Sequence, residues 1–462
     1  MKKSNIFKFT FFVIILTMSF YQCAFCKTQQ STNNKTNIDI INIEFWKNFN
    51  DEILVNSILK VYENNNDLKI SENKIKEAEN IVKISLSNEL PNLAFDGYIS
   101  RTFSSSDEHK GELIIPDYKQ SRFLLPLTMN YELDIWGQNR LKTKSKQKEL
   151  LMLNEDKRAF YISLISSFAI NYYNLVKIDK LIDIQKKLLE NQKQILISYK
   201  IKQNSGTAVE NDIIHEEKKL NILNYELNDL EEKKDILQNQ LCVYLSDRSF
   251  DKVERIDFNN INFTPKIPQE IKLSQLETRP DYKKIQYKLE KTGLDVKIAK
   301  RDFLPKFTIF GTLGFNAYQF SNIISSHSKM FNLGVAPYLD IFDGTRKFQI
   351  LKIHKHRFDS AINEYEKTIL TSIQETNDAL YNLKSTCANF KLVKNYYDLD
   401  FKDLNLVAKK IDFGVATNID LFRKKEELLL SEKQKVNLKI DEIISFINLY
   451  KALGGIEPYE NI

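Results

Sequence analysis

Apolar residues recur at steps of three and four along residues 161–189, a spacing that places them on one face of a helix. The stripe consists of Tyr161, Leu164, Phe168, Tyr172, Leu175, Ile178, Ile182 and Leu189. No proline occurs between Pro126 and Pro265, so no residue there forces the helix to end. We predict a helical arm of ~65 residues, roughly 100 Å long at ~1.5 Å per residue. That length is typical of a coiled coil or tunnel wall.

Single glycines mark the turns of two predicted helical hairpins. The first proline-free region contains only Gly137 and Gly206, and the second, between Pro337 and Pro458, contains Gly344, Gly414, Gly454 and Gly455. Gly206 follows Gly137 at nearly the same distance as Gly414 follows Gly344. Because glycine commonly ends a helix and lets the chain turn, we predict two hairpins of the same build that turn at Gly206 and Gly414.

Four other segments alternate apolar and polar residues with a period of two: 93–99, 125–135, 307–315 and 331–341. Each has about the length of a tilted strand that crosses a bilayer. An apolar face and a polar face are typical of strands in a water-filled barrel, although a half-buried soluble sheet has the same pattern. The polar connections 102–122 and 316–330 are predicted to be outward-facing loops.

The two halves of the chain repeat at an offset of about 208 residues. The matches are Leu90-Pro91 with Leu304-Pro305, Leu133–Trp136 with Leu339–Phe342, Arg140 with Arg346, Gly206, Ala208 and Asp212 with Gly414, Ala416 and Asp420, and Leu241 and Leu245 with Leu449 and Leu453. Their order is the same in both halves. We therefore predict two internal repeats, each with one strand pair and one helical hairpin.

The N-terminus has the pattern of an export signal. Lys2 and Lys3 precede an apolar run over residues 6–20, which is too short for a transmembrane helix. Cleavage after Cys26 would release a chain that begins near Lys27, whereas lipidation at Cys23 is the less favoured alternative. No later stretch has 18 consecutive apolar residues, so a membrane-spanning mature protein would cross with strands.

Composition excludes several classes of function. The chain has 67 Lys+Arg and 61 Asp+Glu, a net charge of +6, which gives no indication of nucleic-acid binding. Cys242 and Cys387 cannot form a disulfide framework, and His354 and His356 fall on different faces of a helix. The sequence contains no phosphate-binding glycine loop and no nucleophile elbow. We expect a protein without catalytic activity, cofactor or metal.

Five motifs, one of them present at both hairpin tips, resemble the TolC family of outer-membrane efflux proteins, particularly its NodT-type branch. They are YELDIWGQNR from Tyr131, the stretch from Arg279 to Gly311, LDIFDGTRK from Leu339, the two tips SGTAVENDI and FGVATNIDLF, and YKALGG from Tyr450. The resemblance covers roughly residues 40–458.

The resemblance implies a homotrimer in the outer membrane with a periplasmic extension. Three chains would supply four strands each to a twelve-stranded barrel that continues as an α-helical coiled-coil tunnel. A periplasmic adaptor and an inner-membrane pump would dock at the tunnel tips and supply energy for efflux or secretion, while lipid of the outer membrane would surround the barrel. The rival interpretation is a coiled-coil scaffold or adhesin at the cell surface.

The predicted segments follow from these elements. They are a signal peptide (1–26), periplasmic or equatorial helices (27–90), a first β-hairpin (91–136), a first helical hairpin with an equatorial linker (137–264), an equatorial segment and helix (265–304), a second β-hairpin (305–342), a second helical hairpin (343–453) and a tail (454–462).

The resemblance also assigns roles at the hairpin tips. Adaptor docking falls on Gly206, Thr207, Ala208, Gly414, Val415 and Ala416, and the candidate gate consists of Asp212, Asp420 and Arg423. Helix capping is the alternative for the acids, because Thr417 with Asp420 and Thr207 with Glu210 have capping-box spacing. Arg423 departs from the family, whose tips commonly carry a second acidic residue at that position.

Overall fold

The computed structural model describes residues 42–104, 109–110, 113–114, 118–269 and 271–458. The predicted leader, with Cys23 and the alternative cleavage site, lies outside these residues. The chain divides into two compact units, one made of residues up to 65, 160–275 and from 375 onward, the other of residues 66–159 and 276–374. Two helices, α5 (Gln138–Asn204) and α9 (Arg346–Asp412), contribute to both units.

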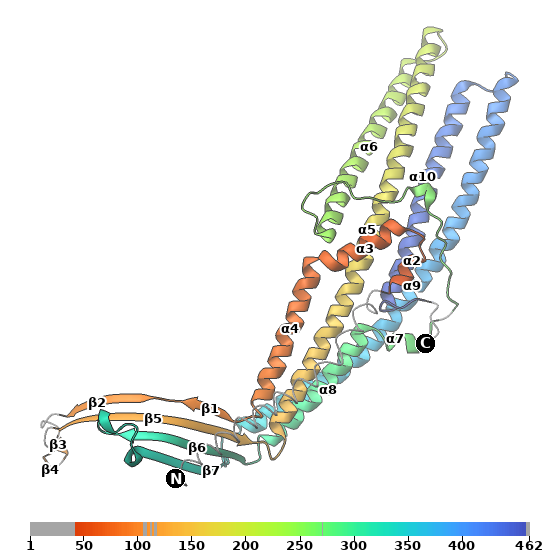
Figure 1. Cartoon of the computed structure of the whole chain (residues 1–462). Coiled ribbons are helices and arrows are strands. Elements are labelled where there is room, and N and C mark those ends of the chain that lie inside the picture. Colours follow the sequence, from red (N-terminus) through yellow and green to blue (C-terminus); the bar gives the residue numbers. More distant parts are fainter. Residues whose placement is uncertain (1–41, 105–108, 111–112, 115–117, 270, 459–462) are drawn as a thin grey trace. The chain divides into compact units, whose positions relative to one another are not determined.

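The second unit contains an antiparallel sheet, seen at the lower left of Figure 1. Its strands are β1 (Asn92–Phe95), β2 (Tyr98–Ser104), β5 (Tyr118–Leu133), β6 (Lys306–Ala317) and β7 (Lys329–Tyr338). Their order is β1-β5-β6-β7, with β2 also paired to β5. Two short strands, β3 (His109–Lys110) and β4 (Leu113–Ile114), pair with each other.

β1 and β2 continue one register along β5. Phe95 lies opposite Leu127 and Tyr98 opposite Leu124. The ladder is interrupted opposite Pro126, which has no N–H to donate, although its carbonyl still accepts from the Asp96 N–H at 3.3 Å. On the other side of β5, Gly314 lies opposite Pro126, and a Cβ there would come within 2.2 Å of the Leu125 carbonyl oxygen. Glycine is therefore required for this close approach.

The first strand pair reaches further than its side-chain pattern predicts. Residues 102–122 were expected to form a loop, which was wrong at both ends, because β2 continues to Ser104 and β5 begins at Tyr118. Main-chain groups make the ladder, so polar residues such as Gln120 pair as well as apolar ones. At the other end, Ile135 and Ile341 were predicted in strands but follow the last strand residues, Leu133 and Tyr338.

The helices of the second unit pack side by side next to the sheet (Figure 1). They are α4 (Asn66–Ser87), α8 (Pro280–Arg301) and the first parts of α5 and α9. Ser145 of α5 donates to Asp295 of α8 at 2.7 Å. The hydroxyls of Tyr282 on α8 and Tyr365 on α9 lie 2.8 Å apart. Polar pairs therefore join the neighbouring helices.

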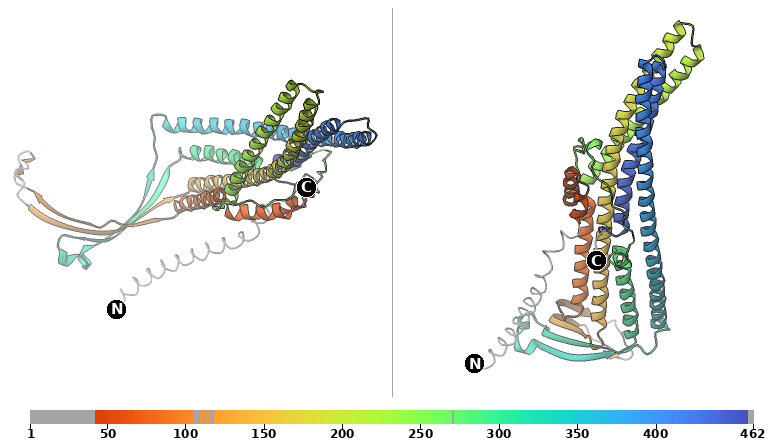
Figure 2. Two further views of the ribbon diagram at one scale, coloured as in Figure 1. Left: turned by 90° about the horizontal axis from the view of Figure 1, so that it is seen from above. Right: turned by 90° about the vertical axis from the view of Figure 1, so that its right-hand side faces the viewer.

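The first unit contains the two predicted helical hairpins. The rest of α5 turns back as α6 (Glu210–Leu245), and the rest of α9 turns back as α10 (Asn418–Ala452), the yellow-green and blue hairpins of Figure 2. Every residue of the predicted apolar stripe from Tyr161 to Leu189 is buried. α5 and α9 have 67 residues each, and α6 and α10 have 36 and 35.

Shorter elements complete this unit. They are α2 (Ile43–Lys47), α3 (Glu52–Asn64) and the 3-10 turn η1 (Phe258–Asn260). The short helix α7 (Leu273–Leu276) spans the boundary between the units. In the second unit, the 3-10 turns η2 (Phe320–Asn322) and η3 (Ser326–Ser328) lie in the β6–β7 connection. Phe45 stacks on Tyr450 at 3.9 Å between ring centroids, and Phe49 stacks on Phe263 at 4.4 Å. These rings fix the N-terminal helices and the α6–α7 connection against α10. Among the described residues, no helix is both long and apolar enough to cross a membrane.

Candidate functional site: the hairpin tips and the strand-to-helix junctions

The first hairpin turns at a glycine in the left-handed region. Gly206 has φ +72°, and its N–H donates to the Gln203 carbonyl at 2.9 Å. Thr207 closes the end of α5, because its N–H and its Oγ1 both donate to the Lys202 carbonyl, at 2.9 and 3.0 Å. These bonds satisfy carbonyls that the end of a helix leaves without partners.

The second tip repeats this geometry. Gly414 has φ +71° and donates to Ile411 O at 2.8 Å. A Cβ at either tip glycine would meet no atom within 4 Å, so backbone conformation rather than space requires glycine here. Large apolar side chains next to both turns face solvent: Val209 is 63% exposed, Phe413 83% and Val415 75%.

Asp420 is a helix-capping residue. Its Oδ2 accepts from the Thr417 N–H at 2.8 Å, and Thr417 Oγ1 accepts from the Asp420 N–H at 3.3 Å. This reciprocal pair is the capping box predicted from the sequence. The hydrogen bond from the Thr417 backbone lowers the pKa of Asp420 below that of an ordinary aspartate, so its carboxylate is ionised at neutral pH.

Asp212 plays the corresponding part at the first tip. The prediction of a box between Thr207 and Glu210 was wrong, because the N-cap of α6 is Val209. Asp212 is therefore the third helical residue, and its Oδ2 accepts from the Val209 N–H at 3.3 Å. Valine has no side-chain oxygen that could accept a hydrogen bond from the Asp212 N–H, so only the carboxylate half of a capping box is present.

Arg423 links the two hairpins. One guanidinium nitrogen donates to Glu216 of α6, and the other donates to Glu426 at 3.2 Å. Glu216 is only 2% exposed, and its second oxygen accepts from Gln192 Nε2 of α5 at 2.7 Å. Burial disfavours the guanidinium charge, but the hydrogen bond and charge of Glu216 raise the pKa of Arg423 above its ordinary value. Close to the tips, a buried glutamate paired with a half-buried arginine thus joins α10 to both arms of the first hairpin.

Glu216 is a buried acid that was not among the residues predicted for the tips. One signal was present, since Ile213, Glu216 and Leu220 have the spacing of a helical stripe, in which Glu216 replaces an apolar residue. A carboxylate at such a position needs a buried partner. Only the structure identifies that partner, because Arg423 is 207 residues away in the chain.

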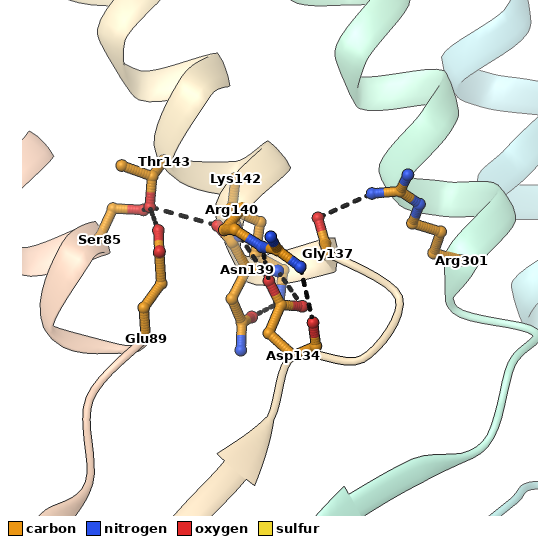
Figure 3. Close-up of polar contacts among 9 residues, drawn as sticks. All are labelled: Ser85, Glu89, Asp134, Gly137, Asn139, Arg140, Lys142, Thr143 and Arg301. Atoms are coloured by element: carbon orange, nitrogen blue, oxygen red, sulfur yellow. Dashed lines mark hydrogen bonds and ion pairs between the residues drawn. The ribbon is translucent and has the colours of Figure 1, made fainter.

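The junction between β5 and α5 is built around Asp134 (Figure 3). Its carboxylate accepts from the backbone N–H groups of Asn139 and Arg140, both at 3.0 Å, and from Arg140 Nε at 3.2 Å. Partial burial alone would raise the pKa of Asp134, but these hydrogen bonds lower it below the ordinary value. The negative charge faces the positive end of the α5 dipole.

Neighbouring helices are tied to the same junction (Figure 3). Arg301 of α8 donates to the Gly137 carbonyl at 2.7 Å, and Gly137 has φ +67°. Thr143 of α5 donates to Glu89, just after α4, at 2.6 Å. The LDIWG motif therefore directs the chain from the strand into a helix that is fixed on both sides.

The second junction uses a different acid. Asp340 matches Asp134 in the sequence repeat, but it forms an ion pair with Lys347 Nζ at 3.1 Å. Asp343 supplies the capping bond instead, accepting from the Lys347 N–H at 3.0 Å. Gly344, with φ +66°, follows Asp343 and makes the turn into α9.

The remaining candidates form no chemical site. Cys242 and Cys387 are both free. In the described ranges, no group of three or more His, Cys, Asp or Glu side chains could hold a metal ion. His354 and His356 lie on α9 without such a group.

The strands of the antiparallel sheet lead through capped junctions into long helical hairpins, which is the combination of elements that the sequence predicts for an outer-membrane channel subunit. The sequence profile of the outer membrane efflux protein family matches residues 58–244 and 274–455. The chain belongs to this family of channel proteins. It is a channel subunit of an efflux system in the bacterial outer membrane.

Named relatives and solved structures agree with this assignment. The solvent efflux pump outer membrane protein SrpC of Pseudomonas putida is 23% identical over 88% of this chain and 86% of the relative. The cation efflux system protein CusC of Escherichia coli K12 is 20% identical over 89% and 88%. The crystal structure of the Campylobacter jejuni CmeC outer membrane channel shares the fold, with a TM-score of 0.79, 23% identity and coverage of 94% and 92%. None of these relatives supports a scaffold or adhesin.

Proposed function

We propose that three copies of this chain close a twelve-stranded barrel in the outer membrane and continue it as a helical tunnel in the periplasm. The observation that carries this proposal is the sheet itself, which ends in β1 and β2 on one side and β7 on the other. Open edges present unpaired backbone groups, which are costly in lipid. Pairing the edges of neighbouring copies would remove this cost, and the number three comes from the family resemblance.

Cell fractionation tests the proposal directly. The full chain should be recovered from the outer membrane as a detergent-stable trimer that dissociates to monomers on heating. The two sheet edges supply the reason, since each needs a partner strand. A soluble monomer in unextracted cells would overturn the barrel.

The tips are proposed to receive a periplasmic adaptor, which connects the channel to an inner-membrane pump. Support comes from the exposed apolar side chains of Val209, Phe413 and Val415 beside the tip glycines. The proposed contact surface includes Gly206, Thr207, Ala208, Gly414 and Ala416. The channel itself would offer passive exit. The relatives are named for exporting solvents in one case and cations in another, so no substrate is assigned.

The gate is proposed to combine Asp212, Asp420 and Arg423. In a trimer, three copies of Asp420 near the axis would repel one another and attract cations. The Arg423–Glu216 pair would hold the second hairpin against the first and keep the tip closed. The gate is compatible with capping, because the capping hydrogen bond leaves the Asp420 carboxylate charged.

A further inference from the structure

A cavity of about 720 Å³ lies in the second unit, between α8 and the first parts of α5 and α9. Exposed lysines surround it: Lys144 from α5, and Lys297 and Lys300 from α8. Half-buried apolar side chains line it as well, namely Leu289 and Leu294 of α8 and Phe358 of α9. Its volume falls within the range of ligand pockets, ~300–1,000 Å³.

Three of the four lysines that line this cavity have no acidic partner among the described residues. Residues 138–148 contain five Lys or Arg and residues 297–301 three, and neither stretch contains Asp or Glu. Lys148 forms an ion pair with Glu290 at the cavity. Within the described part of the chain, Lys144, Lys297 and Lys300 make no ion pair. The cavity therefore favours an anion.

Gly293 helps to open the cavity. It lies in the interior of α8, where glycine destabilises a helix by ~1 kcal/mol relative to alanine. A Cβ at this position would come 3.4 Å from the Phe358 ring, its nearest neighbour. A Cβ would therefore fit, but the absent side chain leaves space beside that ring that a larger residue such as leucine would occupy.

The cavity lies close to the ends of the strands. Lys300 lies one residue before the end of α8, shortly before β6 begins at Lys306, and Lys144 lies six residues after the start of α5 at Gln138. At ~1.5 Å per helical residue, Lys144 lies roughly 9 Å along α5 from the start of that helix. The headgroup layer of a bilayer is ~5–8 Å thick on each side, so a lysine side chain can reach a headgroup.

We propose that this cavity binds an anionic phospholipid of the periplasmic leaflet. The phosphate would lie between Lys144, Lys297 and Lys300, and the start of an acyl chain would cover Leu294 and Phe358. This inference rests on the proposed barrel, because the barrel places the strand ends at the membrane surface. It adds a specific lipid site to the general lipid contact of the barrel wall.

Native mass spectrometry of the full-length trimer tests the site, with dioleoylphosphatidylglycerol as the probe and dioleoylphosphatidylcholine as the zwitterionic comparison. The wild-type protein should retain the phosphatidylglycerol preferentially. The triple variant K144Q/K297Q/K300Q should weaken that retention at least about tenfold, because each basic group near a membrane contributes to anionic-lipid affinity. Gly293→Leu, which fills the cavity without a change in charge, should weaken it as well.

The matched control is K352Q/K355Q/R357Q, which removes three charges from the exposed part of α9 outside the cavity and should change retention less than about twofold. Equal losses in both triple variants would overturn the site in favour of diffuse attraction. Displacement of the lipid by an equal concentration of inorganic phosphate would also overturn it, since the site would then recognise only an anion.

All variants are compared as trimers from the outer membrane. A trimer without lipid preference refutes the lipid site alone, whereas failure to recover any trimer refutes the proposed function.

Discussion

At the scale of single residues, Asp420 caps a helix with a carboxylate whose charge the proposed gate would use. Asp420 caps α10 through Thr417, and Arg423 lies three residues further along the same helix. Capping explains why an acid occupies position 420, but it leaves the charge of that acid available at the tip. The two functions can be separated because a neutral amide still accepts a hydrogen bond.

We predict that Asp420→Asn weakens cation selectivity and cation block in planar-bilayer recordings. The amide oxygen can keep accepting from the Thr417 N–H, so only the charge is lost. Thr417→Ala is the matched control, since it removes the capping hydroxyl but keeps the carboxylate. If Asp420→Asn lowers thermal stability while selectivity and block stay the same, Asp420 caps the helix without gating.

Arg423→Gln should raise conductance and destabilise the contact between the hairpins by ~3 kcal/mol, because it removes the cation in direct contact with the buried Glu216 and leaves only Lys219, at 4.0 Å. The paired variant Glu216→Gln/Arg423→Gln should recover part of that stability. Lys424→Gln serves as the control, since Lys424 pairs with Glu427 at the surface. Thermal unfolding of the detergent-solubilised trimer and single-channel conductance measure both effects. Equal conductance and equal stability of the Arg423 and Lys424 variants would show that the Arg423–Glu216 pair does not hold the tip closed.

At the scale of elements, the junctions determine where strands end and helices begin. Asp134 accepts two backbone N–H groups at the start of α5, and Arg301 holds the turn residue Gly137 from α8. The backbone can therefore leave the sheet within a few residues without unpaired groups at the helix start. The second junction reaches the same result with Asp343.

Asp134→Ala should destabilise the start of α5 by ~1–2 kcal/mol, the usual effect of a lost N-terminal cap. Hydrogen exchange of the amides at 139–141 should accelerate, whereas amides in α10 should not change. Because the folded state lowers the pKa of Asp134, its stabilisation is present above the ordinary aspartate pKa and is lost as the pH falls through the lowered pKa. Exchange that is insensitive to the substitution would exclude a capping role.

At the scale of the whole molecule, the sheet should have a lipid face and a water face. Leu127 and Leu333 are 44% and 60% exposed in the single chain, as lipid-facing residues should be. Asn130 and Asn332 fall on the opposite set of alternating positions. The proposed barrel would direct these amides toward its water-filled interior.

Leu127→Lys or Leu333→Lys should reduce recovery of the trimer from the outer membrane, because a charge on the lipid face near mid-membrane costs ~2–4 kcal/mol. Asn130→Lys and Asn332→Lys are the matched controls on the other face and should assemble better. Quantitative blotting of outer-membrane fractions measures the difference. Equal recovery of all four variants would show that the two faces are wrongly assigned.

The sequence by itself determined the features that depend on local order. The apolar stripe from Tyr161 to Leu189 predicted a buried helix face, and all eight residues are buried. Gly206 and Gly414 predicted the turns, because glycine readily adopts the left-handed backbone that ends α5 and α9. The Thr417–Asp420 cap also followed from spacing alone, since both partners lie within one helical turn.

Tertiary structure decided what depends on distant partners or on the backbone. Strand pairing extended β5 to Tyr118, because a ladder of main-chain bonds does not require apolar side chains. The start of α6 at Glu210 made Asp212, rather than Glu210, the capping acid. The burial of Glu216 and its pairing with Arg423 join positions 207 residues apart. No periodicity in the sequence records such a contact, because it exists only once the two hairpins pack together.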